Sequence, residues 1–131
     1  NMRDFVKRNI HGVVGYGMGG AYALQFACHR KRLRAAVSYY GKMIQPREQI
    51  KDLFSPVLYH QAGKDTWATN EDAEQLRGAA AEYGKQAEIC VYPDAPHAFC
   101  NEMKPDAYRA DDTALAWERT AAFLKTCFQG T

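Results

Sequence analysis

Two residues of types that serve in acid–base catalysis each follow a short apolar run. Asp65 comes after Val57-Leu58-Tyr59-His60, and His97 comes after Ile89-Cys90-Val91-Tyr92. A histidine can take a proton from a nucleophile, and an aspartate can orient the imidazole and stabilise the imidazolium. Taken singly, Asp65 could be a turn residue and His97 an ordinary loop histidine. Together they predict acid–base chemistry, provided that the fold brings them into contact.

A third candidate lies in the glycine-rich stretch Gly12–Gly20, which reads GVVGYGMGG. A β-branched run that stops at clustered glycines and restarts with a helical pattern is a strand turning sharply into a helix. In a nucleophile elbow, Gly-Xaa-nucleophile-Xaa-Gly, Gly17 would occupy the nucleophile position without a side chain. As a dinucleotide fingerprint the stretch lacks the expected acidic residue, because none occurs between Gly20 and Glu48. A turn that binds nothing is the third possibility.

The segments between these residues predict an α/β fold. Strands are expected at Val13-Val14, 35–40, 57–60 and 89–92, and helices at 18–30, from Thr69 or Asn70 to Gly84, and from about Asp112, with Trp117, Ala121, Leu124 and Phe128 at helical spacing. Residues 1–9 also have helical spacing. Alternating strands and helices indicate about four parallel strands with helices on both faces. Functional residues gather at the carboxyl edge of such a sheet, which is where Gly17, Asp65 and His97 would lie.

Composition limits the classes of function. The 131 residues suffice for one core, and a net charge of +2 argues against nucleic-acid binding. No apolar run is long enough to span a membrane. The four cysteines have no paired metal spacing, so neither a zinc site nor a disulfide framework is expected, and free thiols favour a cytoplasmic setting.

The motifs taken together resemble the dienelactone hydrolase family, small α/β hydrolases that open enol-lactones with a Cys-Asp-His triad. The resemblance rests on GYGMGG, AAVSYYG, PVLYH followed by GKD, VYPDAPHAF and ALAWERTAAF, and covers nearly the whole chain. By this resemblance Asp65 and His97 fall on the family's acid and base, and Gly17 falls on its cysteine. It implies that residues 1–131 are the C-terminal half of the family's domain, a truncated α/β-hydrolase fold.

The implied activity is hydrolysis of a small-molecule ester or lactone, impaired or absent in this chain because Gly17 supplies no thiolate. The Met18 amide is expected to serve the oxyanion, and Tyr16, Tyr39, Trp67 and Phe99 are expected to line the substrate pocket. No cofactor or metal is expected. One alternative is a pseudoenzyme that binds a lactone, a carboxylate or a protein partner, and another is a nucleotide-binding domain. Cys100 as a relocated nucleophile would lack the elbow.

The resemblance also bears on assembly. The family's domain is nearly twice as long, and its N-terminal half holds the first strands and a loop that donates a second oxyanion amide. Without those strands, Val13-Val14 would form an apolar sheet edge, which invites pairing. A homodimer with two-fold symmetry is therefore expected.

Overall fold

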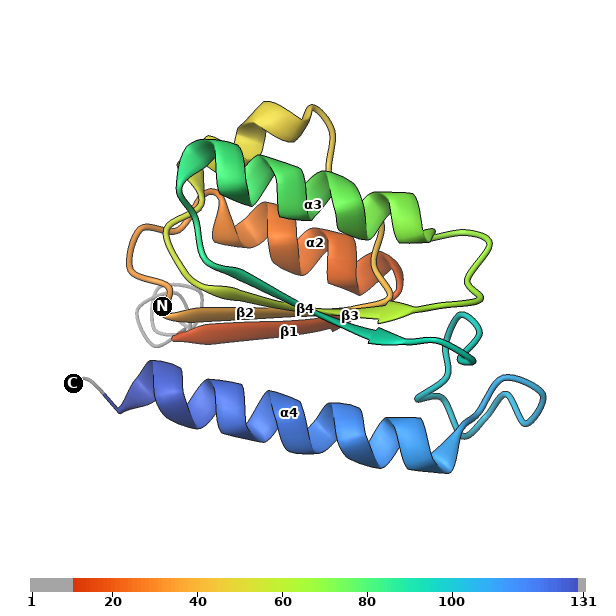
Figure 1. Ribbon diagram of the computed structural model, residues 1–131. Coiled ribbons are helices and arrows are strands. Elements are labelled where there is room, and N and C mark those ends of the chain that lie inside the picture. The colour runs from red at the N-terminus through yellow and green to blue at the C-terminus, as the bar shows by residue number, and fades with distance from the viewer. Residues whose placement is uncertain (1–10, 130–131) are drawn as a thin grey trace, which may run out of the picture.

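Four parallel strands form the centre of the computed structural model, which describes residues 11–129. Their order in the sheet is β1-β2-β3-β4, with bounds β1 (Gly12–Tyr16), β2 (Ala35–Tyr39), β3 (Val57–Ala62) and β4 (Ala87–Tyr92). Helices α2 (Met18–Ala27) and α3 (Asn70–Tyr83) cover one face, and α4 (Ala110–Phe128) covers the other (Figure 1). The predicted α/β fold with helices on both faces is confirmed. The helix expected over residues 1–9 lies outside the described residues.

The central strands β2 and β3 are buried along their whole length. Continuous apolar runs are typical of parallel strands that are covered on both faces. Leu24, Leu76 and Tyr59 contribute to the core between the sheet and the layer of α2 and α3. A short 3-10 helix, η1 (Arg47–Asp52), lies within the connection from β2 to β3 and adds Ile50 to the same core.

Helix α3 follows its local sequence signals closely. Thr69 and Asp72 form a capping box at its start, and Gly84 closes it in the left-handed conformation with φ 66°. Helix α2 is shorter than predicted and ends at Ala27 rather than Arg30. The reason is a tight turn, in which the His29 amide donates to the Phe26 carbonyl over 3.0 Å.

Helix α4 begins two residues before the predicted start and contacts the sheet through a different face. Ala116 and Thr120 are buried against the sheet, whereas Trp117 is 48% exposed. The predicted stripe is therefore wrong at Trp117, Ala121 and Phe128, which are exposed to solvent, while Leu124 is partly buried against the core.

None of the helices within residues 11–129 has the length and apolar character needed to cross a membrane.

A buried polar network joins α4 to the sheet. His60 of β3 contacts the Tyr92 hydroxyl through Nδ1 at 2.9 Å and the Thr120 hydroxyl through Nε2 at 2.8 Å. The Tyr39 hydroxyl lies 2.6 Å from the same Thr120 oxygen. Burial, with a smaller contribution from the positive charge of Arg119, lowers the pKa of His60 from its usual 6.5 to about 3. The folded chain therefore holds His60 neutral.

Acid should weaken the fold through His60. Below pH 6.5 the unfolded chain binds a proton at this residue that the folded chain does not bind until about pH 3. The stability present above pH 6.5 is therefore lost as the pH falls, by about 2 kcal/mol between pH 7 and pH 5. We expect urea unfolding to show this loss as a smaller free energy of unfolding at pH 5 than at pH 7. The His60→Gln variant should lack the part of this pH dependence that comes from His60. The exposed His29→Gln is the matched control, and an unchanged pH dependence in His60→Gln would contradict the assignment.

The expected dimer stays a prediction. Among the described strands β1 has one neighbour, and Val14 on it is 37% exposed. We expect sedimentation at micromolar concentration to show a dimer that Val14→Lys converts to monomer, because a charge at the edge opposes pairing. Val91→Lys on the opposite edge strand, β4, is the matched control. A compact monomer with protected amides along residues 12–15 would refute the prediction.

Candidate active site

The turn from β1 into α2 has the backbone conformation expected at a nucleophile elbow. Gly17 has φ 58° and ψ −123°, a combination that residues with a Cβ rarely adopt. Its amide donates to the Tyr39 carbonyl over 2.9 Å, which fastens the turn to the end of β2. A Cβ on Gly15 would lie 1.9 Å from the Gly19 carbonyl oxygen, so strand and helix approach this closely only because residue 15 is glycine.

Asp65 and His97 form a hydrogen-bonded pair. Asp65 Oδ2 lies 2.6 Å from His97 Nδ1, and the Asp65 side chain is fully buried. Its other oxygen, Oδ1, accepts the amides of Trp67 at 2.8 Å and Ala68 at 2.9 Å. Both carboxylate oxygens are thus satisfied, as a buried charge requires. Since Nδ1 faces the carboxylate, Nε2 is the nitrogen that faces the cavity.

Backbone hydrogen bonds fasten the two loops that carry this pair. Gly63 donates to the Tyr92 carbonyl over 2.8 Å, and Lys64 donates to the Ala95 carbonyl over 3.0 Å. Both loops follow neighbouring parallel strands, β3 and β4, so they emerge at the same edge of the sheet. The position of His97 relative to Asp65 therefore depends on the backbone as well as on the side chains.

Gly17 lies directly opposite the free nitrogen of the pair. A Cβ built at Gly17 would lie 3.7 Å from His97 Nε2. A side chain at this position would therefore start in contact with this nitrogen. Met18 is the first residue of α2, so its amide is one of those at the helix start that find no partner inside the helix. The structure thus brings Gly17, Met18, Asp65 and His97 together.

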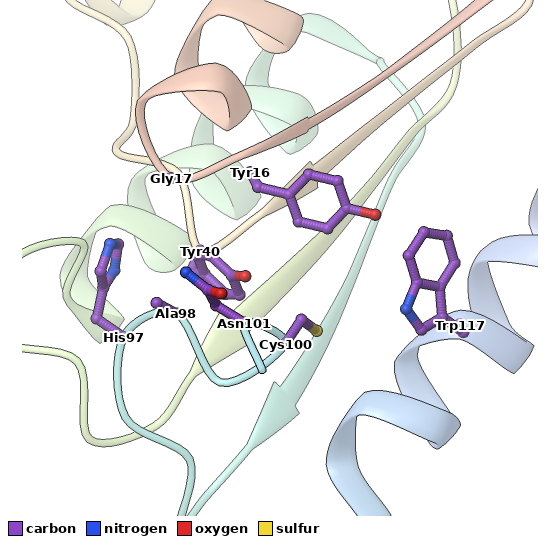
Figure 2. A pocket seen from close by; sticks show the side chains of 8 residues that line it. All are labelled: Tyr16, Gly17, Tyr40, His97, Ala98, Cys100, Asn101 and Trp117. Carbon is purple, nitrogen blue, oxygen red and sulfur yellow. The ribbon is translucent and has the colours of Figure 1, made fainter. Parts of the chain in front are cut away.

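Of these residues, Gly17 and His97 border a cavity of about 400 Å³ (Figure 2). Its lining residues are Tyr16, Gly17, Tyr40, His97, Ala98, Cys100, Asn101 and Trp117. Of the residues expected from the sequence, Tyr16 lines the cavity. Tyr39 and Phe99 are fully buried in the core between the sheet and α4, where Tyr39 contacts Thr120. Trp67 lies outside this lining and packs edge-on against the His97 ring, with 5.0 Å between ring centres.

Sequence reasoning missed the part of the pocket that α4 and the histidine loop supply. Trp117 reaches the cavity from α4, and Ala98 and Asn101 flank it from the loop after β4. Besides Gly84, the described residues with positive φ are Gly17, Tyr40 at 42° and Ala98 at 66°, which all line this cavity. Strained backbone of this kind clusters at functional sites. Single-residue patterns carry no signal for it.

Two other interpretations of the site, Cys100 as the nucleophile and a dinucleotide-binding turn, gain no support from the structure. Burial raises the pKa of the Cys100 thiol, which disfavours the reactive thiolate. In Figure 2 Cys100 lies toward Trp117, whereas His97 lies at the opposite end of the cavity. The end of β2, where a dinucleotide site would place an acidic residue, carries Tyr39 and Tyr40. Within residues 11–129, no group of three potential metal-binding side chains is positioned to hold a metal ion.

The chain is similar to known proteins over most of its length. A Yersinia pestis protein named "Putative carboxymethylenebutenolidase" is 36% identical over 116 residues, which cover 82% of this chain and 43% of that protein. An Escherichia coli K12 protein of the same name is 34% identical, covering 86% of this chain and 45% of that protein. The crystal structure of a "Putative Dienelactone Hydrolase" from Klebsiella pneumoniae matches with a TM-score of 0.83 and 29% identity, over 92% of this chain and 56% of that one.

The chain thus spans about half the length of the curated relatives that it matches. The sequence profile described as "Dienelactone hydrolase family" matches residues 3–128, which is nearly the whole chain. The chain that carries the turn at Gly17 and the Asp65–His97 pair therefore belongs to the dienelactone hydrolase family.

Proposed function

We propose that this chain is a carboxylic ester or lactone hydrolase domain whose turnover is severely impaired because residue 17 is glycine. The observation that carries the proposal is the alignment of three groups. Asp65 holds His97 Nδ1 at 2.6 Å, and His97 Nε2 faces the side-chain position of Gly17 at 3.7 Å. This is the geometry in which a histidine takes the proton of a nucleophile and an aspartate stabilises the imidazolium.

The roles within the proposal follow from position. His97 is the general base and acid, Asp65 orients it, and the Met18 amide donates to the developing oxyanion, as the amide after the nucleophile does in α/β hydrolases. The attacking atom is missing, because Gly17 has no side chain. Loss of the nucleophile in a serine protease costs about a millionfold in turnover. The remaining route is attack by a water molecule that His97 activates, without a covalent intermediate.

The proposed substrate is a small ester or lactone. A cavity of about 400 Å³ with the rings of Tyr16, Tyr40 and Trp117 in its lining suits a small, partly apolar acyl compound. The relatives named carboxymethylenebutenolidase support a lactone as one candidate. The setting that we propose is cytoplasmic, which the four free cysteines support.

A second candidate function is binding without turnover. The cavity is intact although the nucleophile position lacks a side chain, and the His97 side chain is 33% exposed and so accessible to a ligand. A pseudoenzyme could retain a small lactone or carboxylate there, or a protein segment. Saturable binding of a lactone with no product formed would favour this candidate over hydrolysis.

The unmodified chain should hydrolyse 4-nitrophenyl acetate at no more than a trace rate, because no side chain at residue 17 can form an acyl-enzyme. We expect His97→Ala to remove what activity there is and the exposed His29→Ala to leave it unchanged, as measured by release of nitrophenolate. Robust hydrolysis that His97→Ala abolishes would show that the nucleophile lies elsewhere.

Gly17→Cys should create a reactive thiol. Its sulfur would lie beside His97 Nε2, and a thiol next to a histidine has a lowered pKa. We expect iodoacetamide at pH 7 to label this thiol about tenfold or more faster than the same thiol in the Gly17→Cys/His97→Ala double variant. The native cysteines give little background, because burial raises the pKa of all four, that of Cys28 to about 11. Equal labelling rates in both variants would refute the proposed role of residue 17.

A further inference from the structure

The space at Gly17 is open to a small molecule. Apart from the chain neighbours of Gly17, the described residues place one atom, His97 Nε2, within 4 Å of a Cβ built there. At Gly15, by contrast, the backbone of Gly19 fills the corresponding space, with its carbonyl oxygen at 1.9 Å. Gly17 and His97 both line the cavity of about 400 Å³, so the space beside Nε2 is continuous with room for a second small molecule.

His97 is held in the orientation that a base requires. Its ring packs edge-on against Tyr40 at 5.1 Å and against Trp67 at 5.0 Å, both measured between ring centres. Asp65 occupies Nδ1, and among the described residues no group forms a hydrogen bond with Nε2. The nitrogen that faces Gly17 can therefore accept a proton from whatever enters the space.

We propose that a diffusible low-molecular-weight thiol occupies the space at Gly17 and that the site transfers an acyl group to it from an ester or lactone. This inference rests on the proposed function, because it uses the same base and the same acyl substrate. The sulfur of the thiol takes the position that the terminal atom of a side chain at residue 17 would hold. The activity is then that of an acyltransferase with an external nucleophile.

The reaction balances without an oxidant or a reductant. His97 Nε2 takes the proton of the thiol, and the sulfur forms a bond to the acyl carbon. The oxygen on that carbon accepts a hydrogen bond from the Met18 amide. The bond from the acyl carbon to the alcohol oxygen then breaks, and His97 returns its proton to that oxygen. The products are a thioester and an alcohol. From a lactone, both groups remain in one molecule.

A thiol is more easily activated by His97 than water is. A thiol has a pKa near 8.5, whereas that of water is about 15.7, so the imidazole takes a thiol proton far more readily. The cost is the loss of a tethered nucleophile, and well-oriented intramolecular groups have effective molarities of about 10⁵–10⁸ M. We therefore expect the reaction with a diffusible thiol to remain slower than that of an enzyme with its own nucleophile.

The test measures release of nitrophenolate from 4-nitrophenyl acetate over a series of 2-mercaptoethanol concentrations, with the rate of the protein-free mixture subtracted. General base catalysis contributes about 10²–10⁴-fold, so we expect a saturable increase that is at least about tenfold larger in the parent chain than in His97→Ala. The His29→Ala variant should match the parent. Mass spectrometry should identify the acetyl thioester of 2-mercaptoethanol as the product.

Two further arms make the test specific to the space at Gly17. A bulky tertiary thiol should give a much smaller increase than 2-mercaptoethanol, because its branched carbon needs more room between Gly17 and His97 Nε2. Gly17→Ala should lose the increase, because its Cβ occupies the space beside His97 Nε2, and its circular dichroism spectrum shows whether the variant is folded. The inference is overturned if the rate is linear in thiol concentration and equal in the parent and His97→Ala. This holds whatever the result with Gly17→Ala.

Failure of this inference is distinguishable from failure of the proposed function. If Gly17→Cys is labelled rapidly in a His97-dependent manner while thiols have no effect on the parent chain, the base stands and the external nucleophile is refuted. If the new thiol of Gly17→Cys is not activated by His97, the assignment of the base fails, and both proposals fail with it.

Discussion

The charge of Asp65 is the constraint on which the arrangement of the site depends. A carboxylate with a fully buried side chain is costly unless each oxygen has partners, and here two loop amides and the His97 ring supply them. The loop after β3 must therefore fold back on its own aspartate, and the loop after β4 must bring its histidine within hydrogen-bonding distance. Removal of either partner would leave a buried charge unsatisfied, so the geometry of the site and the local folding depend on the same contacts.

Around this pair the backbone adopts conformations that ordinary residues avoid. Tyr40 and Ala98 have positive φ although each carries a Cβ, and both border the cavity beside Gly17. Such conformations persist only when surrounding contacts over-determine them. The Tyr40 amide, for example, donates to the His60 carbonyl over 2.7 Å. The chain thus combines a strained turn at Gly17, which carries no side chain, with strained backbone at two further residues that line the same cavity.

Local signals in the sequence predict the strands, helix α3 and the meeting of Asp65 with His97. The strands appear as apolar runs, α3 has a capping box and a closing glycine, and each site residue follows a strand whose carboxyl end lies at the same edge. The pocket walls were not predictable in this way. Tyr39 and Tyr40 are neighbours that both pack in the core between the sheet and α4, because the alternation of the strand ends at Tyr40, where φ is positive. Of the two, only Tyr40 also borders the cavity.

The rotation of α4 could not be predicted from apolar spacing either. Its face toward the sheet contains Thr120, a polar residue whose partners His60 and Tyr39 lie on strands far away in the sequence. Thr120 and Trp117 are three residues apart, so they lie on adjacent turns of one helix. The buried Thr120 hydroxyl therefore fixes the position of α4 relative to the sheet. This contact sets the rotation and height of α4 against the sheet, and with them the position of the Trp117 side chain, which lines the cavity. A contact deep in the core thereby influences the shape of the cavity.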